Sequence, residues 1–493
     1  MKKLLIANRG EIARRIIRTA HKMGIRTVAV YSDADREALY VQEAYEAIHI
    51  GPAPSKESYL NMDRIIKAAK DSGADAIHPG YGFLSERAEF SKRVAEAGLE
   101  FVGPSAYSIN LMGDKIAAKK CARSMNVPML AGTPEAITDI NECILIAKEI
   151  GFPVLIKAAA GGGGKGMRIV HHEDELEEQV TIASNEALSS FGDGAVFIEK
   201  FLTAPKHIEV QLIADKHGNV CYLFERECSV QRRHQKIIEE APSASISEEV
   251  RKEIGEAAAR MAISCNYHGA GTVEFLLDDQ QKFYFLEMNT RLQVEHPVTE
   301  FITGLDLVEL QLRIARNEKL PFTQEQLTRH GHAIELRVNA EDPYNEFAPS
   351  VGVLTKYTIP KGEGIRVDDA YQEGQEIPIY YDPMIAKLIV FGQTRIHAIE
   401  KLKAAIKQYQ IEGIKTNLHY GEYILQHPDF VNATMTTKFA EQTMDDFLSG
   451  NLEHKEEEVA CIIGLLAYLR EKNLVKPAVI QSNDWYLQRK VNR

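Results

Sequence analysis

The sequence predicts an α/β protein of several domains, α+β when taken as a whole, and three observations lead to this. The chain has 493 residues, too many for one ordinary core, so we expect about two to four domains. Residues 2–7 read as a short buried strand, residues 11–22 as an amphipathic helix and residues 27–31 as a second strand. This order begins a doubly wound α/β unit. A strand-rich region follows residue 331, with helices expected at 395–409 and 418–426.

Composition excludes several classes of function. The hydrophobic content of 45% and charged content of 26% are typical of a globular protein. The net charge of −12 argues against a broad surface for nucleic acid or anionic membranes, so a phosphate site requires a local concentration of basic residues. The longest apolar run, residues 459–469, falls short of the ~20 residues of a membrane span, and the N-terminus lacks the apolar core of a signal peptide. Six cysteines without C-x-x-C spacing suit reduced thiols, and we expect a cytoplasmic protein.

Two early loops are candidates for ligand contact. The turn after the first strand is Asn-Arg-Gly-Glu at residues 8–11, so the G-x-G-x-x-G of a dinucleotide site is missing. A further strand at residues 74–78 runs into Pro-Gly-Tyr-Gly-Phe-Leu-Ser-Glu at residues 79–86. Two glycines at the carboxyl end of a strand suit a ligand-facing loop, although an ordinary turn has the same composition.

A glycine-rich loop lies between two predicted strands, at residues 152–157 and 167–170. It reads Ala-Ala-Ala-Gly-Gly-Gly-Gly-Lys-Gly at residues 158–166, where backbone N–H groups can approach phosphate oxygens and Lys165 adds charge. A P-loop would add Lys-Ser/Thr and a following helix, so this is another kind of phosphate loop or a mobile linker. A strand at residues 196–202 places Glu199 and Lys200 where they suit an adenine edge.

The segment at residues 287–295 alternates in polarity and organises the predicted site. In an extended chain its odd positions form one polar face about 25 Å long, running from Glu287 through Asn289 to Glu295. A strand with one solvated face is the alternative. Strands at 272–277 and 282–287 flank a hairpin turn, and this register sets Glu274 opposite Glu287. Two facing carboxylates followed by Asn289 suit Mg²⁺. The basic stretch at residues 231–236 suits an anionic substrate or is a solvated turn.

Taken together, these blocks resemble the biotin carboxylase branch of the ATP-grasp superfamily. The resemblance covers residues 1 to about 446 in the family's order and rests on several long motifs. They are Ala-Asn-Arg-Gly-Glu-Ile-Ala at 7–13, His-Pro-Gly-Tyr-Gly-Phe-Leu-Ser-Glu at 78–86, the glycines of 161–166, Gln-Arg-Arg-His-Gln-Lys at 231–236, Glu-Met-Asn-Thr-Arg-Leu-Gln-Val-Glu-His-Pro at 287–297 and Glu-Leu-Arg at 335–337.

The resemblance implies a Rossmann-like domain at residues 1–112, an ATP-grasp domain at 113–333 with a mobile lid at about 131–203, a mixed α+β domain at 334–446 and a helical extension at 447–493. It implies ATP-dependent carboxylation of biotin by bicarbonate. The residues implied to bind ATP are Lys115, Lys157, Gly163, Gly164, Glu199, Lys200, Leu202, His207 and His234, with Glu274 and Glu287. Those implied for a pair of Mg²⁺ or Mn²⁺ ions are Glu274, Glu287 and Asn289, and those for bicarbonate are Lys236, Arg291, Gln293 and Val294.

Four of these side chains are expected to take part in catalysis: Glu295 as the general base, Arg337 at the biotin enolate, and Lys236 and Arg291 at bicarbonate. The resemblance also implies a homodimer that works with a biotin carboxyl carrier protein and a carboxyltransferase. No lysine lies in an Ala-Met-Lys-Met-like context, so we expect biotin to arrive on a separate protein. The final acceptor, whether acetyl-CoA, propionyl-CoA, pyruvate or another compound, stays open. Another ATP-grasp carboxylate–amine ligase and a non-catalytic ATP-binding subunit are the competing hypotheses.

Overall fold

The chain begins with a parallel sheet whose strand order is β3-β2-β1-β4-β5. The computed structural model describes residues 1–133, 135–158, 167–191 and 194–472. The strands are β1 (Lys3–Ile6), β2 (Arg26–Ser32), β3 (Glu46–Gly51), β4 (Ala76–His78) and β5 (Glu100–Phe101); the helices are α1 (Gly10–Lys22), α2 (Leu39–Glu43), α3 (Met62–Ser72), α4 (Ala88–Glu96) and α5 (Ala106–Gly113). The predicted Rossmann-like start is confirmed. Successive residues of β1 enter two different cores, Leu4 in one and Leu5 in the other, which explains its unbroken apolar run.

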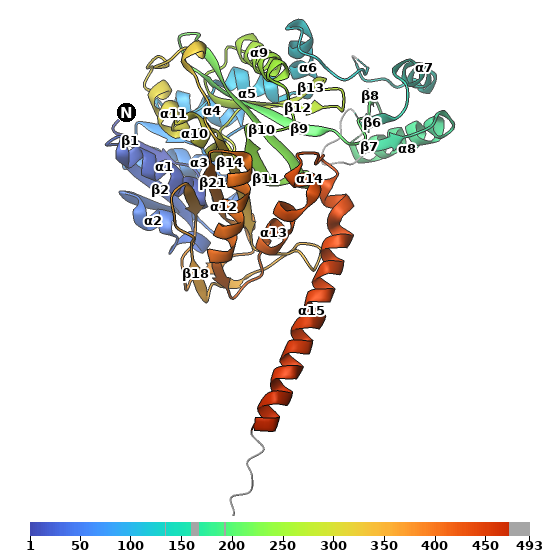
Figure 1. The fold of residues 1–493 in the computed structure, drawn as a ribbon. Helices are drawn as coiled ribbons and strands as arrows, with labels where there is room; N and C mark the ends of the chain where they lie inside the picture. The colour runs from blue at the N-terminus through green and yellow to red at the C-terminus, as the bar shows by residue number, and fades with distance from the viewer. Residues whose placement is uncertain (134, 159–166, 192–193, 473–493) are drawn as a thin grey trace, which may run out of the picture. The chain divides into compact units, whose positions relative to one another are not determined.

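The centre of the molecule is an antiparallel sheet in the order β13-β12-β9-β10-β11-β14-β21-β19. Its strands are β9 (Lys206–Ala214), β10 (Val220–Arg232), β11 (Gln235–Ala241), β12 (Gly269–Leu277), β13 (Phe283–Asn289), β14 (His332–Asn339), β19 (Ile365–Asp369) and β21 (Met384–Gly392). The boundary that we predicted between the ATP-grasp domain and the C-terminal domain, after residue 333, falls inside β14. Strands of the ATP-grasp and C-terminal regions therefore share one sheet, seen near the middle of Figure 1.

Several helices pack against this sheet. Helix α9 (Glu248–Ser264) packs on β9 and β10, and α12 (Arg395–Gln408) packs on β14 and β21. Helix α10 (His296–Thr303) contacts β10, β14 and β21, and it is followed by α11 (Leu307–Ala315). The predicted helices at 395–409 and 418–426 are confirmed as α12 and α13 (Leu418–Gln426). Helix α10 is the element that places the segment before it against the sheet.

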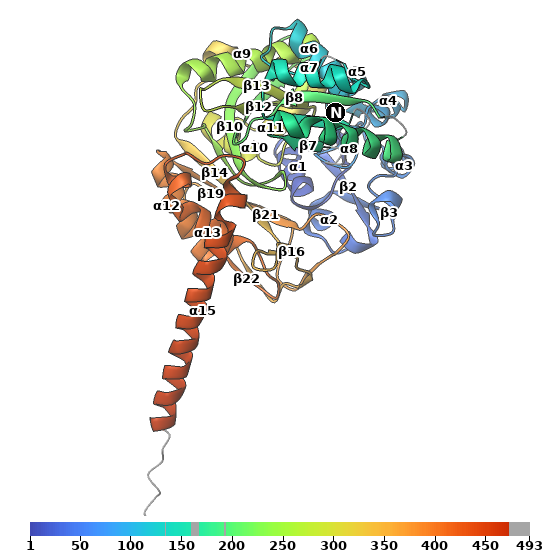
Figure 2. The same cartoon turned by 90° about the vertical axis from the view of Figure 1, so that its right-hand side faces the viewer.

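The expected lid contains a second, smaller sheet in the order β7-β6-β8. Its strands are β6 (Val154–Ala158), β7 (Met167–Val170) and β8 (Val196–Lys200), with helices α7 (Ile140–Ile150) and α8 (Glu173–Phe191); α6 (Lys115–Ser124) precedes them. Figure 2 shows β7, β8, α7 and α8 grouped together. Side chains of these elements form a hydrophobic core of their own, which includes Ile156 and Ile198. Residues 159–166 of the glycine-rich loop lie outside the described residues.

The C-terminal part adds three small two-stranded sheets, β15 (Glu341–Asp342) with β16 (Ala348–Pro349), β17 (Gly352–Val353) with β20 (Glu376–Ile377), and β18 (Lys356–Thr358) with β22 (Gln410–Glu412). Helices α14 (Pro428–Val431) and α15 (Phe439–Lys472) follow. The chain divides into two units, Met1–Ala440 and Glu441–Arg493. The helix expected in the extension lies within α15, and Trp485 falls outside the described residues. Among the residues described, no helix has both the length and the apolarity to span a membrane.

The predicted polar ladder at residues 287–295 is wrong in its second half. Strand β13 ends at Asn289, residues 290–293 are irregular, residues 294–295 form a turn, and α10 begins at His296. Pro297 stands in the first turn of that helix, where its fixed φ is favourable. Side chains at even and at odd positions of this segment are then both buried: Leu292 is 0% and Gln293 2% exposed. The polar side chains meet because the chain bends into a helix, and a straight strand could not bring them together.

Candidate active site

The site is built around Lys236, which β11 projects among three carboxylates. Its Nζ lies 2.5 Å from Oε2 of Glu209, 3.1 Å from Oε1 of Glu274 and 2.7 Å from Oε1 of Glu295. Strands β9 and β12 pair so that Glu209 and Glu274 are directly opposite each other. Burial alone would lower the pKa of Lys236, but the three carboxylates raise it well above its ordinary value. The ammonium group is therefore charged and holds acids that would otherwise repel one another.

Glu295 ends the bent segment and is almost completely buried, with 1% of its surface exposed. One carboxylate oxygen contacts Lys236, and the other accepts a 2.9 Å hydrogen bond from Nη2 of Arg337 on β14. Burial would raise the pKa of Glu295, but Lys236, Arg337 and Arg226 together hold it well below its usual value. The carboxylate is thus ionised at neutral pH and ready to accept a proton.

Arg337 also contacts a second acid, Glu239 of β11. Its Nε donates a 2.6 Å hydrogen bond to Oε1 of Glu239. Burial raises the pKa of Glu239 to about 7, and burial also raises that of Glu335, its cross-strand neighbour, well above the ordinary value. Burial thus disfavours the charged form of Glu335, and the carboxylates in direct contact with Arg337 are those of Glu295 and Glu239.

Arg226 is a central residue that the sequence did not single out. It is completely buried in β10, where Nε donates to Glu209 at 2.5 Å and Nη2 donates to Oε1 of Gln293 at 2.5 Å. Nη1 donates to Gln211 at 2.7 Å and to Thr299 of α10 at 3.0 Å. The alternation of residues 207–211 was the available signal, since Glu209 and Gln211 required a buried partner.

The hairpin register predicted for the metal site is confirmed. Glu274 of β12 pairs directly with Glu287 of β13. Burial and the neighbouring Glu274 raise the pKa of Glu287 against the opposing effect of Lys115, so the two carboxylates repel each other. Oε1 of Glu274 accepts hydrogen bonds from Asn289 and Gln293, each at 2.8 Å. Oxygen donors and two neighbouring acids that repel each other fit a hard divalent cation at this place.

The residues expected to bind bicarbonate lie next to this hairpin. Nε of Arg291 donates to Glu86 at 2.8 Å, and its Nη2 donates to Oδ1 of Asn289 at 3.1 Å. The backbone carbonyl of Val294 accepts a 2.9 Å hydrogen bond from Lys387. Neither Glu86 nor Lys387 was a predicted site residue, although Glu86 ends one of the quoted motifs.

The N-terminal motifs also reach this region. Nδ2 of Asn8, after β1, donates to the carbonyls of Pro79 and Tyr81, after β4, each at 2.7 Å. Gly80 lies between them at φ +62°, where a Cβ would stand 2.8 Å from that same nitrogen. The Tyr81 hydroxyl donates to the Glu11 carboxylate. The two motifs thus form one structure at the carboxyl edge of the parallel sheet.

The residues expected to bind ATP lie in two groups. In the first, Glu199 accepts hydrogen bonds from Lys157, at 2.6 Å, and from Lys119, which the sequence did not identify. Lys200 donates to the carbonyls of residues 151 and 152, and Leu202 follows β8. In the second, Nε2 of His207 lies 2.9 Å from Glu274. Four more predicted positions are placed as follows: Lys115 starts α6, His234 is exposed in the β10–β11 turn, and Gly163 and Gly164 lie outside the described residues.

Comparison with known proteins decides the family. Residues 1–109 match the biotin carboxylase N-terminal domain, 114–323 the ATP-binding domain of the carbamoyl-phosphate synthase L chain, and 335–442 the biotin carboxylase C-terminal domain. The biotin carboxylase of Halalkalibacterium halodurans is 52% identical over 438 residues, which are 89% of this chain and 97% of that protein. This chain belongs to the biotin carboxylase family.

Two further relatives of the family show its variety. The propionyl-CoA carboxylase alpha chain of Ruegeria pomeroyi is 50% identical over 471 residues, 91% of this chain and 69% of that longer protein. The dimeric biotin carboxylase domain of the Hydrogenobacter thermophilus 2-oxoglutarate carboxylase, solved with MgADP, ADP and bicarbonate, has a TM-score of 0.83 at 46% identity. That match covers 90% of this chain and 98% of the solved one. The ATP-grasp fold and the biotin carboxylase activity expected from the sequence are thereby supported.

Proposed function

We propose that this chain uses ATP and bicarbonate to carboxylate biotin presented by a carrier protein, with the residue roles described below. The observation that carries these roles is the buried Glu295 carboxylate, held between Lys236 and Arg337. Bicarbonate attacks the γ-phosphorus of ATP, ADP leaves, and carboxyphosphate forms. Carboxyphosphate then delivers its CO₂ unit to the ureido nitrogen of biotin. The bond from carbon to the phosphate oxygen breaks, a carbon–nitrogen bond forms, and the released phosphate takes the proton that the nitrogen loses.

Bicarbonate is a weak nucleophile while it keeps its hydroxyl proton, and Glu295 is the group placed to remove it. Lys236, Arg291 and Gln293 surround the same end of the site and supply the positive charge and amide donors that an anion needs. An arriving anion would share the charge of Lys236, and this weakens the hold of Lys236 on Glu295. Binding of bicarbonate therefore raises the basicity of Glu295 at the moment when a base is required.

Biotin's ureido nitrogen becomes nucleophilic when charge develops on the neighbouring ureido oxygen. Arg337 is the guanidinium that faces the catalytic base, and it is held in place by Glu239. A fixed guanidinium at that oxygen stabilises the enolate form of biotin. Arg337 and Glu295 are in contact, so the deprotonation of bicarbonate and the carboxylation of biotin take place next to each other.

ATP is expected to lie between the small sheet and the hairpin. Glu199, Lys157, Lys200 and Leu202 would contact one part of the nucleotide, and His207 and His234 the other. Glu274, Glu287 and Asn289 would hold Mg²⁺ or Mn²⁺, which neutralises charge on the phosphate oxygens when bound. Closure of the small sheet over the site would protect carboxyphosphate from water.

The carrier protein, a carboxyltransferase and a second copy of this chain remain proposed partners. A dimer is described for the Hydrogenobacter domain, which is similar to this chain along 98% of its length. The final acceptor stays open, because the acceptors named for the relatives differ from one another. The cytoplasmic location stays a prediction.

The first experiment measures bicarbonate-dependent ADP release by the purified wild-type chain, with and without free biotin. We expect ADP release to require bicarbonate and to rise when biotin is added, because biotin consumes carboxyphosphate productively. If ADP release does not change with biotin but increases with another amine, a different ATP-grasp ligase is favoured. ATP binding without any ADP release would favour a regulatory subunit.

A second experiment tests the metal residues. Chelation of divalent ions should abolish ADP release, and Mg²⁺ should restore it. Glu287→Gln should raise the Mg²⁺ concentration needed for half-maximal rate by about tenfold or more, because one carboxylate ligand becomes a weaker amide. Asp279→Asn, in the exposed turn of the same hairpin, is the matched control and should leave the Mg²⁺ requirement as it is in the wild type. An equal requirement in both variants would remove Glu287 from the metal site.

A further inference from the structure

Lys387 is a buried lysine that none of the roles above uses. It lies in β21 and is 0% exposed, which is rare for a lysine. Its Nζ lies 3.3 Å from Oε2 of Glu11 and 3.9 Å from Oδ2 of Asp368, and it donates a 2.9 Å hydrogen bond to the carbonyl of Val294. These contacts join α1, β19 and the segment before α10 at one ammonium group.

The position of Lys387 relative to the catalytic base follows from the sheet register. In the β14–β21 ladder, Lys387 is directly opposite Arg337, so both side chains leave the same face. Arg337 holds the carboxylate of Glu295, and Lys387 holds the carbonyl of Val294, one residue earlier. Two cations from neighbouring strands therefore fix two successive residues of the bent segment.

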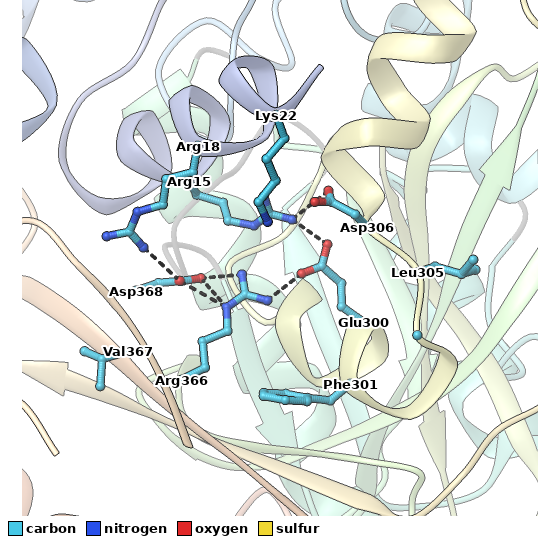
Figure 3. A pocket seen from close by; sticks show the side chains of 11 residues that line it. Arg15, Arg18, Lys22, Glu300, Phe301, Leu305, Asp306, Arg366, Val367 and Asp368 are labelled. Carbon is cyan, nitrogen blue, oxygen red and sulfur yellow. Dashed lines mark hydrogen bonds and ion pairs between the residues drawn. The ribbon is translucent and has the colours of Figure 1, made fainter. Parts of the chain in front are cut away.

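Asp368, whose Oδ2 lies 3.9 Å from Nζ of Lys387, is itself fixed by a further ion pair. Asp368 accepts a 2.6 Å hydrogen bond from Nη2 of Arg366, whose Nη1 donates to Glu300 of α10 at 2.7 Å. Figure 3 shows these three side chains in a row, with Arg15 approaching Glu300 from α1. Because α10 begins directly after Glu295, the same network anchors the segment at its carbonyl and at the helix that follows.

We propose that Lys387 is a positioning residue that fixes the peptide between Val294 and Glu295, and with it the orientation of the base and of the bicarbonate site. This inference rests on the function proposed above. The competing explanation is that Lys387 serves only to neutralise Glu11 and Asp368 in the core. The two explanations differ in one respect: only the first needs the hydrogen bond to the Val294 carbonyl.

Three variants separate these explanations: Lys387→Met, Glu11→Gln and the double variant that combines them. Lys387→Met removes the hydrogen bond but leaves Glu11 charged and buried beside an apolar side chain, which lowers stability. The double variant removes that charge as well and keeps the side-chain volumes close to those of the wild type. Glu11→Gln keeps the hydrogen bond to Val294. Thermal unfolding of each variant is measured first, and kcat and KM for bicarbonate and for ATP follow.

We expect kcat/KM for bicarbonate to fall about 10- to 100-fold in both variants that lack Lys387, since a small misplacement of the base is costly. KM for ATP should stay close to the wild-type value, and Glu11→Gln should retain most of the activity. Recovery of bicarbonate kinetics in the double variant would overturn the proposal in favour of charge neutralisation. If Lys387→Met does not fold, the bicarbonate kinetics of the double variant are compared with those of Glu11→Gln and of the wild type instead. A wild type without bicarbonate-dependent turnover would instead refute the proposed function.

Discussion

Glu295→Gln should reduce carboxybiotin formation by about a thousandfold, within the range that removal of a general base causes. The substitution keeps the size and the hydrogen-bonding shape of the side chain. It removes only the negative charge and the capacity to accept a proton, so ATP binding should remain nearly intact. Carboxybiotin is measured by transfer of labelled bicarbonate to free biotin, and ATP affinity is measured by calorimetry.

The charge balance around Lys236 indicates that Glu295→Gln keeps the site intact, and the melting temperature of the variant is the control. In Glu295→Gln, Lys236 still faces Glu209 and Glu274, at 2.5 Å and 3.1 Å, so its ammonium group keeps two partners. Loss of activity through collapse of the site would then appear as a lowered melting temperature, which we do not expect. Wild-type rates of carboxylation in the variant would show that another group takes the proton.

The depressed pKa of Glu295 has a consequence for the pH profile. In the free enzyme, Lys236 and Arg337 keep this carboxylate ionised well below pH 4.5, its ordinary pKa. At a fixed concentration of the bicarbonate ion, which is itself protonated in mild acid, a fall of kcat/KM for biotin would therefore come from another group, of which Glu239, with a pKa of about 7, is the nearest to Arg337. Glu239→Gln should then flatten the profile between about pH 6 and 8.

Local patterns in the sequence predicted a large part of this structure. The N-terminal α/β unit followed from apolar runs and amphipathic spacing, because these depend on neighbouring residues. The turn at residues 278–281 indicated the hairpin for the same reason, while the pairing of Glu274 with Glu287 also depends on a β-bulge between Glu274 and Phe275. The motifs of the family resemblance then indicated which polar residues meet in space.

What the sequence did not predict depends on contacts between distant segments. The sequence around Arg226 gives no signal of its own beyond the alternation of residues 207–211, and its partners Gln293 and Thr299 lie more than sixty residues away. The same is true of Lys387, whose role appears only when β21 is placed next to β14. The bend after Asn289 was missed because alternating polarity also fits a buried turn in which every polar atom finds a partner. Pro297 was the signal that a helix begins there.

Arg337→Ala should reduce biotin carboxylation about 100- to 1,000-fold, the loss expected when a fixed donor to a developing oxyanion is removed. Bicarbonate-dependent ATP cleavage in the absence of biotin should fall much less, because Lys236 remains in contact with Glu295. Removal of the guanidinium also leaves Glu239 and Glu295 with one cation fewer, so the pKa of Glu295 should rise toward its ordinary value and strengthen it as a base.

The measurement that decides the role of Arg337 is therefore a ratio. Carboxybiotin formed per ADP released should drop steeply in Arg337→Ala, because ATP is still cleaved while the carboxyl group is lost to water. Arg337→Lys is the matched variant: it keeps the charge but cannot contact Glu239, Glu295 and a ligand oxygen with one planar group. We expect Arg337→Lys to restore thermal stability to a greater extent than it restores the amount of carboxybiotin formed per ADP released. Equal losses of ATP cleavage and of carboxylation in both variants would mean that Arg337 acts through Glu295 alone, with no contact to biotin.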